Sequence, residues 1–172
     1  VTQYRPDVII NTAAMTDVDG CEVDRELCWR LNVDGLKNIL IPARRIEGCR
    51  VLQLSTDYVF DGRAAAYDES VRPNPMSYYG KSKLASENAL AASGVPGVTV
   101  RTQVLYGTGY SVRPNFVSWV ISMLEKKMPF KVVADQTGNP TLVDDLAYAI
   151  LKLIESRASG VYHVSGPESI DR

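Results

Sequence analysis

Short apolar runs alternate with a longer stretch of helical spacing at the start of the chain. Residues 7–14 (DVIINTAA) and 50–55 (RVLQLS) are short and apolar, which predicts strands buried on both faces. Between them, apolar side chains recur at helical spacing, which predicts one long helix from about Glu22 to Ile46. These apolar positions are Leu27, Leu31, Leu36, Ile39, Leu40, Ala43 and Ile46.

The same alternation continues through a second crossover. After a Gly/Pro-punctuated loop over 57–75, Ser77 is placed to cap a helix over about 78–92, and residues 97–107 form a third β-rich run. Strand, helix, strand, helix, strand predicts a parallel sheet with right-handed crossovers. Ligands in such sheets sit at the carboxyl ends of the strands, so the residues that follow each strand are the ones to examine.

The pattern becomes less regular after residue 103. A loop at 107–113 precedes a predicted helix over 115–127 and a short strand at 130–133 (FKVV). Thr141 and Asp144 have the spacing of a capping box for a further helix, and 160–165 (GVYHVS) predicts a last strand. The apolar face of that helix comprises Val143, Leu146, Ala147, Ile150 and Ile154.

Composition narrows the class of partners. The chain has 172 residues, 45% of them hydrophobic, enough for one sizeable core. With 19 basic and 20 acidic residues, it has no electrostatic footprint for nucleic acid or for an anionic membrane. No apolar run approaches the roughly 20 residues that span a bilayer, and no signal-peptide pattern is present, so we expect a cytoplasmic protein.

Cysteine and histidine provide little for a metal site. Cys21, Cys28 and Cys49 form no Cys-x-x-Cys motif, and His163 is the single histidine. We therefore expect reduced thiols, no metal and no Ser/His triad, with His163 as an ordinary strand residue.

One helical spacing carries chemistry. Tyr79 and Lys83 are four residues apart and so share a helix face, whereas Tyr78 and Lys81 point elsewhere. An ammonium beside a phenol lowers the phenol pKa from about 10 toward neutrality, which would let Tyr79 transfer a proton.

A hydroxyl is predicted to face this pair. Thr56 lies at the carboxyl end of the second strand, where that strand and the following helix open onto one crevice. The alternative is that Thr56 only caps a turn with Asp57.

Several motifs together carry a family resemblance. NTAAMTDVDGCE, LSTDYVFDG, YYGKSKLASE, VRTQVLYG, ADQTGNPTLVDDLA and VYHVSG follow one another in the order seen in extended short-chain dehydrogenase/reductases. Within that family the chain most resembles the dTDP-4-dehydrorhamnose reductases. The resemblance implies a partial NAD(P)-binding Rossmann-type doubly wound parallel sheet, an α/β fold, with a small C-terminal substrate-binding portion. Residues 1–103 would be the C-terminal half of the dinucleotide-binding domain, and 104–172 would contribute the substrate-binding portion and a returning helix and strand.

The resemblance also implies residue roles. Tyr79 matches the proton donor, Lys83 the lysine that holds the nicotinamide ribose, and Thr56 the residue that binds the substrate carbonyl, with Asp57 helping to hold the sugar. Asn32 matches the asparagine placed behind the active site. The segment that runs along the dinucleotide matches Ala14, Met15 and Thr16. The implied reaction is reduction of the 4-keto group of a dTDP-linked deoxysugar by NADPH or NADH.

One family element has no match in this sequence. The Gly-rich turn that binds the pyrophosphate is not found, and GTGYSVR at 107–113 reads as a surface loop. The resemblance places the first strand of this chain fourth in the family sheet. The residue that distinguishes NAD from NADP follows the second family strand, which has no counterpart in this sequence. The sequence therefore does not predict which of the two cofactors is preferred. We expect the isolated chain to bind the dinucleotide poorly and to turn over little substrate. In the isolated chain the apolar strand at 7–12 would form an edge, which predicts pairing with a second copy, and members of the family often form homodimers.

Val104 is a second departure. Family reductases have a tryptophan against the sugar at the position of Val104, whose neighbours here read RTQVLYG. This residue resembles instead the regulatory beta subunit of methionine adenosyltransferase, a non-catalytic NADP-binding relative. A nucleotide-sugar epimerase, with the same Tyr79 and Lys83, is the other alternative. Dehydratases of the superfamily carry Thr-Asp-Glu where this chain has Thr56, Asp57 and Tyr58, which favours a reductase.

Overall fold

A computed structural model describes residues 1–64, 66–109 and 115–171, and the chain divides into two compact units. The first comprises Val1–Arg101 with Leu153–His163, and the second Thr102–Lys152 with Val164–Arg172. The chain therefore leaves the first unit near the boundary expected at residue 103 and returns to it at its last long strand. The binding roles assigned to the two parts stay predictions.

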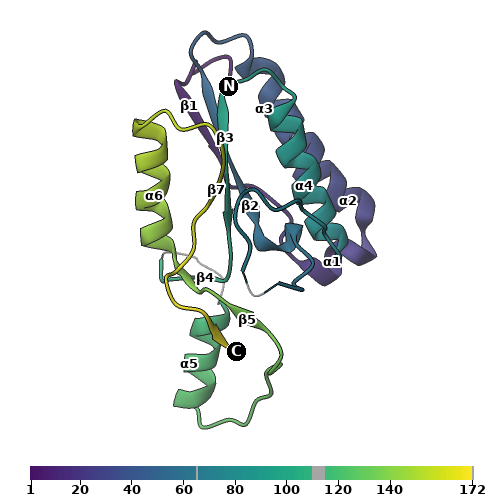
Figure 1. Ribbon diagram of the computed structural model, residues 1–172, viewed down its shortest axis with the longest axis vertical. Coiled ribbons are helices and arrows are strands. Elements are labelled where there is room, and N and C mark those ends of the chain that lie inside the picture. The colour runs from purple at the N-terminus through teal and green to yellow at the C-terminus, as the bar shows by residue number, and fades with distance from the viewer. Residues whose placement is uncertain (65, 110–114, 172) are drawn as a thin grey trace. The chain divides into compact units, whose positions relative to one another are not determined.

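A four-stranded parallel sheet forms the centre of the first unit (Figure 1). Its strands are β1 (Val8–Asn11), β2 (Arg50–Thr56), β3 (Gly97–Thr102) and β7 (Gly160–His163), in the order β1-β2-β3-β7. Val8 pairs with Arg50 in the β1–β2 register, and Val98 with Gly160 in the β3–β7 register, both parallel. The predicted α/β fold with a doubly wound parallel sheet is confirmed.

The helix expected over 22–46 is wrong as a single element. The structure has α1 (Val18–Val23), α2 (Arg25–Trp29), a π-helical turn η1 (Arg30–Asp34) and α3 (Gly35–Ala43). Asp24 interrupts the run because its backbone leaves the helical region, at φ −117° and ψ 77°, and its carboxylate accepts from Leu27 N. A competing side-chain cap of this kind is why aspartate breaks a helix interior and favours a new N-terminus.

Helix α4 (Tyr78–Ala91) follows the sequence prediction closely. Ser77 caps it by accepting from Gly80 N at 3.1 Å.

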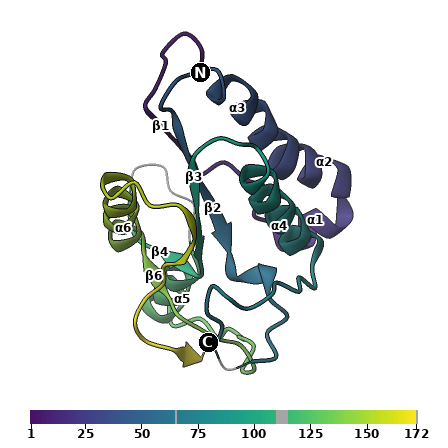
Figure 2. The same cartoon turned by 45° about the horizontal axis from the view of Figure 1, so that its top comes forward.

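Figures 1 and 2 show α1 to α4 together on one side of the sheet. The apolar core between α3, α4 and β2 comprises Leu36, Leu40, Ala43, Cys49, Val51, Leu90 and Val95. All three cysteines are buried with free thiols.

The second unit contains shorter elements. These are β4 (Leu105–Tyr106), α5 (Phe116–Glu125), β5 (Thr137–Gly138), β6 (Thr141–Leu142), α6 (Val143–Glu155, which ends in the first unit) and β8 (Ile170–Asp171). β4 pairs parallel with β6, and β5 pairs antiparallel with β8. Helix α5 begins with a capping box between Asn115 and Ser118. The loop expected at 107–113 lies partly outside the described residues.

Two expectations in this unit are wrong. Residues 130–133 form no strand, since their backbone has no ladder partner among the described residues. Thr141 lies in β6 rather than at a helix cap, because its hydroxyl donates to Asn139 O at 3.1 Å and accepts from Gly166 N at 3.2 Å. These strand contacts remove the hydroxyl that a capping box with Asp144 requires.

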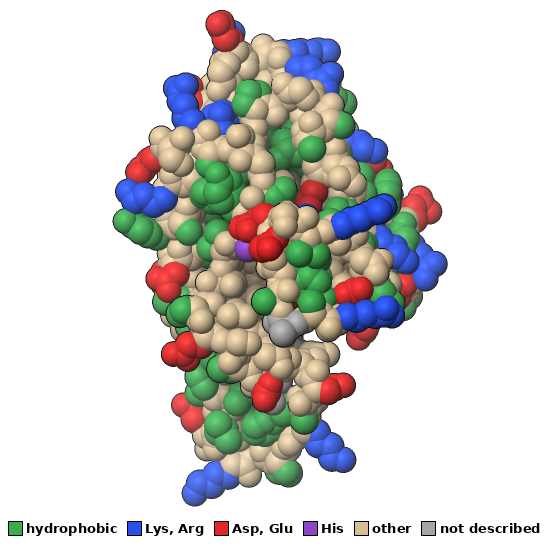
Figure 3. All heavy atoms as spheres, in the orientation of Figure 1, with side chains coloured by type: hydrophobic (Ala, Val, Ile, Leu, Met, Phe, Trp, Pro, Cys, Tyr) green, Lys and Arg blue, Asp and Glu red, His purple; other side chains and the backbone are tan. Residues whose placement is uncertain are grey.

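No helix within the described part of the chain is long and apolar enough to cross a membrane. Figure 3 shows basic and acidic side chains interspersed over the visible face, as expected from nearly equal numbers of each.

Gly80 sets how closely α4 approaches the turn that follows β2, the 3₁₀-helical η2 (Asp57–Val59). A Cβ at residue 80 would overlap the Tyr58 carbonyl oxygen and lie 3.0 Å from Pro75 Cβ. We therefore expect Gly80→Ala to lower the free energy of unfolding by about 2 kcal/mol or more, measured by urea denaturation.

Gly35→Ala is the matched helical control, since its nearest new neighbour, Arg30 O, would lie at 3.7 Å. It should leave stability unchanged or raise it by about 0.5–1 kcal/mol. Equal effects of the two substitutions would contradict the close-approach explanation.

Candidate active site

Tyr79, Lys83 and Thr56 come together where α4 lies against the carboxyl end of β2. All three are buried, with only 8% of Tyr79 and 3% of Lys83 exposed. Lys83 Nζ donates to the Leu54 carbonyl at 2.7 Å. The i, i+4 face predicted for Tyr79 and Lys83 is thus directed at the last residues of β2.

Thr56 has the turn-capping role that was weighed as its alternative. Its hydroxyl accepts from Tyr58 N at 3.2 Å, which caps η2, and donates to Asp57 Oδ1 at 2.9 Å. The Thr56 side chain also interacts with the Tyr79 phenol in the sense that lowers the pKa of Tyr79. Turn capping therefore leaves the hydroxyl near the tyrosine, and its contact with a substrate stays a prediction.

The pKa of Tyr79 moves opposite to the expectation from Lys83. Burial raises the pKa of Tyr79 to about 12, and its hydrogen bond with Thr56 opposes this only in part. Burial also lowers the pKa of Lys83 to about 8, opposed by the negative charge of Glu87. The predicted lowering of the tyrosine pKa is wrong here because desolvation of the phenolate is the largest influence on Tyr79, and Lys83 is not among the groups that shift its pKa most. Tyr79 is held as a neutral phenol, the form that donates a proton.

A hydrogen-bond network joins α4 to the segment after β1. The Asn32 amide accepts from Met15 N at 2.7 Å and donates to Met15 O at 3.1 Å and to Ser82 Oγ at 2.9 Å. Ser82 Oγ in turn donates to Tyr79 O at 2.7 Å. Asn32 lies in the π-helical turn, an irregularity that often marks functional sites. The network holds the chain at Met15 in a fixed position relative to Tyr79.

The remaining candidates lie as follows. Ala14 and Met15 are half-buried and Thr16 is exposed, directly after β1. Val104 belongs to the second unit, so its part in a common site stays a prediction. Its backbone is left-handed, with φ 42°, a strained conformation for a β-branched residue.

The other tyrosine and lysine of the motif lie outside this arrangement. The Tyr78 ring packs under the Arg25 guanidinium at 5.3 Å, and Lys81 is exposed. Within the described residues, no group of three His, Cys, Asp or Glu side chains is placed to hold a metal ion.

Sequence reasoning missed two polar residues of this region. Ser82 and Glu87 are both buried on α4, where the helical spacing from Tyr79 is the only signal that could have found them. Glu87 pairs with Arg101 of β3.

The lowered pKa of Lys83 predicts a particular pH dependence of stability. Since the folded value of about 8 lies below the ordinary 10.5, the folded state binds fewer protons between these pH values, and stability rises with pH. We expect the difference in free energy of unfolding between wild type and Lys83→Met to move in favour of wild type by on the order of 3 kcal/mol from pH 8 to 10.5.

Urea denaturation of both proteins at several pH values measures this difference. Other titrating groups contribute equally to the free energy of unfolding of both proteins, so their contributions cancel. The exposed Lys81→Met serves as the control and should show no such trend. A flat difference for Lys83→Met would contradict a strongly desolvated ammonium.

The chain is similar to proteins of known name over nearly its whole length. It is 38% identical over 163 residues to the spore coat polysaccharide biosynthesis protein SpsK of Bacillus subtilis, covering 94% of this chain and 56% of that protein. It is 36% identical over 174 residues to dTDP-4-dehydrorhamnose reductase of Mycobacterium tuberculosis, covering 96% and 56%. The chain therefore spans somewhat over half the length of these relatives.

A solved structure shows the same fold. The crystal structure of dTDP-4-dehydrorhamnose reductase from Bacillus anthracis in complex with NADP matches with a TM-score of 0.93 and 38% identity, over 99% of this chain and 60% of that one. The resemblance to dTDP-4-dehydrorhamnose reductases and the partial Rossmann-type fold, both expected from sequence, are confirmed. Residues 1–172 match the family model described as the RmlD substrate binding domain, and the chain belongs to this family.

Proposed function

We propose that the protein reduces the 4-keto group of a dTDP-linked deoxysugar with NADPH or NADH. The observation that carries this proposal is the juxtaposition of Tyr79, Lys83 and Thr56 at the carboxyl end of β2. Relatives named dTDP-4-dehydrorhamnose reductase, one of them bound to NADP, support the same reaction class.

The residues present fit a nicotinamide cofactor. Lys83 offers an ammonium group of the kind that binds ribose hydroxyls, and Ala14, Met15 and Thr16 offer backbone directly after a parallel strand. A reduced nicotinamide, when bound, supplies the hydride, while the protein supplies position and electrostatics.

The chain's own residues would handle the proton. The neutral Tyr79 phenol would donate a hydrogen bond to the substrate carbonyl oxygen and give its proton to the developing alkoxide. Thr56 would donate a second hydrogen bond once its hydroxyl turns from Asp57 to the substrate. The Lys83 ammonium, one helical turn from Tyr79, would favour the phenolate left after proton transfer. Asp57 and Val104 are proposed to contact the sugar.

We further propose that the protein works in the cytoplasm and that activity requires more than these 172 residues. The Gly-rich pyrophosphate site of the family has no match in this sequence, and the relatives are longer. The preference between NADP and NAD is left to experiment.

The reaction is tested in a chimera in which this chain replaces the matching part of the Bacillus anthracis reductase. We expect NAD(P)H oxidation with dTDP-4-dehydrorhamnose, and a loss of kcat of about 100-fold or more in Tyr79→Phe, because the proton donor is removed. Loss of NAD(P)H absorbance measures both.

Tyr78→Phe is the matched control and should retain most of the activity, since its ring packs against Arg25. Full activity in Tyr79→Phe would refute the assigned proton donor. A chimera that binds the dinucleotide but turns over no sugar would favour a regulatory, non-catalytic role.

For these 172 residues in isolation, a homodimer through the edge of the sheet is the proposed assembly. Among the described residues β1 pairs only with β2, and Ile10 on this strand is 44% exposed. Edge strands with free backbone groups pair readily with a second copy. We expect light scattering to give the mass of two chains at high concentration, and Ile10→Lys to weaken the association.

Ile41→Lys, on the exposed face of α3, is the control for an added charge. A strict monomer at every concentration would exclude this dimer.

A further inference from the structure

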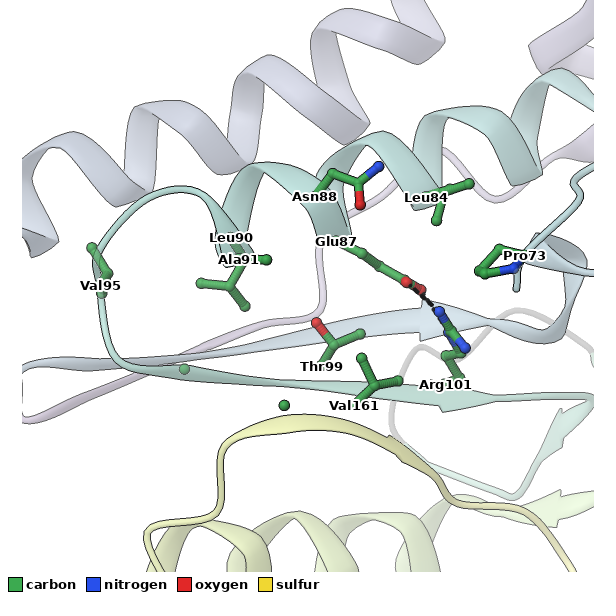
Figure 4. Close-up of a pocket in the computed structure, with 12 residues that line it drawn as sticks. Pro73, Leu84, Glu87, Asn88, Leu90, Ala91, Val95, Thr99, Arg101 and Val161 are labelled. Atoms are coloured by element: carbon green, nitrogen blue, oxygen red, sulfur yellow. Dashed lines mark hydrogen bonds and ion pairs between the residues drawn. The ribbon is translucent and has the colours of Figure 1, made fainter. Parts of the chain in front are cut away.

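Glu87 lies on α4 one turn after Lys83 and is almost fully buried, with 5% exposed. Its Oε1 accepts from Arg101 Nε at 3.0 Å and from Ser55 Oγ, and its Oε2 accepts from Arg101 Nη2 at 2.7 Å. Figure 4 shows the two side chains reaching toward one another from α4 and β3. One carboxylate therefore joins the helix to two neighbouring strands.

Arg101 is itself held from its other side. Its guanidinium lies 5.2 Å from the centre of the Phe60 ring, and Nη1 lies 3.3 Å from His163 Nε2. A guanidinium only donates, so Nε2 must accept, and the ring proton sits on Nδ1, which donates to Tyr67 O at 3.1 Å. Glu69 accepts from the His163 backbone nitrogen at 2.8 Å. The Arg101 guanidinium therefore contacts Phe60 and His163 in addition to Glu87.

The pair lies at the wall of a cavity. This cavity, of about 390 Å³, lies between α4 and the strands β3 and β7, and Glu87 and Arg101 are among its lining residues (Figure 4). The bidentate ion pair is thus a direct polar contact that holds α4 to β3 beside the apolar residues of the same wall.

Three successive turns of α4 contact three successive residues of β2. Tyr79 meets Thr56, Lys83 donates to Leu54 O, and Glu87 accepts from Ser55. Among the described residues, Glu87 has the largest effect against the desolvation of the Lys83 ammonium, ahead of Cys28, so it favours the charged lysine.

We propose that Glu87 is a positioning residue of the active site: with Arg101 and Ser55 it fixes α4 against the end of β2 and keeps Lys83 charged. The catalytic role of Lys83 in this assignment rests on the proposed reductase function. A buried ion pair contributes little net stability, which is consistent with a role in geometry and charge.

The test uses the chain itself and needs no substrate. The pH titration of Lys83 is followed by NMR of its ¹³Cε resonance in wild type and Glu87→Gln. We expect the midpoint to fall by about one pH unit in the variant, because a buried negative charge is removed one turn away. Glu26→Gln, an exposed acid on α2, should leave it unchanged.

A second variant distinguishes an effect of Glu87 on the titration of Lys83 from an effect on folding. Glu87→Gln leaves Arg101 buried without a carboxylate and can unfold the chain, whereas Glu87→Gln with Arg101→Met removes both charges. A lowered Lys83 midpoint in either folded variant supports the proposal. An unchanged midpoint, or unfolding of both variants, overturns it.

The chimera provides the functional readout. If the reaction requires charged Lys83, kcat is lost as pH rises through the Lys83 midpoint, and this loss should occur at lower pH in Glu87→Gln. An unshifted pH profile in a folded variant would overturn the positioning role. Absence of any turnover in the wild-type chimera would refute the reductase function, while the NMR titration still decides whether Glu87 controls the charge of Lys83.

Discussion

Helix α4 presents three polar side chains, Tyr79, Lys83 and Glu87, to the last residues of β2 at successive turns. Each finds a polar partner there, respectively Thr56, Leu54 O and Ser55. Lysine and glutamate are rarely buried unless they are paired, so this helix can lie against the sheet only at the register that satisfies all three. The position of the site follows from that constraint.

Two other features depend on the same docking. Gly80 permits the close approach of α4 to the turn after Thr56, and Asn32 connects Tyr79, through Ser82, to the backbone at Met15. The apolar core lies further along α4, at Leu90, and between α3 and β2. Tyr79, at the other end of α4, packs in a smaller buried cluster with Cys21 and Cys28, so apolar contacts support the polar ones there.

Desolvation gives the site its electrostatic character. The pKa values of Tyr79 and Lys83 both move toward the neutral forms, to about 12 and about 8, because burial penalises charge. An i, i+4 pair read from sequence suggests only mutual stabilisation of charged forms. In the folded protein the neutral phenol is retained, and Glu87 opposes the loss of charge from Lys83.

Much of this protein is determined by local sequence. Apolar runs and turn residues predicted the parallel strands, Ser77 marked the start of α4, and the spacing of Tyr79 and Lys83 placed both on one helix face. These features depend on residues close together in the chain, so periodicity and capping reveal them. Local pattern failed at Asp24, Thr141 and 130–133, where a competing cap, a strand contact or the lack of a ladder partner decided the outcome.

Only the tertiary structure decided which polar residues meet across long separations. The contacts of Glu87 with Arg101 and Ser55, of Arg101 with His163, and of Asn32 with Met15 and Ser82 join different elements. The direction of both pKa shifts likewise depends on how deeply the site is buried. Burial and long-range pairing are properties of the packed chain, and no spacing along the sequence specifies them.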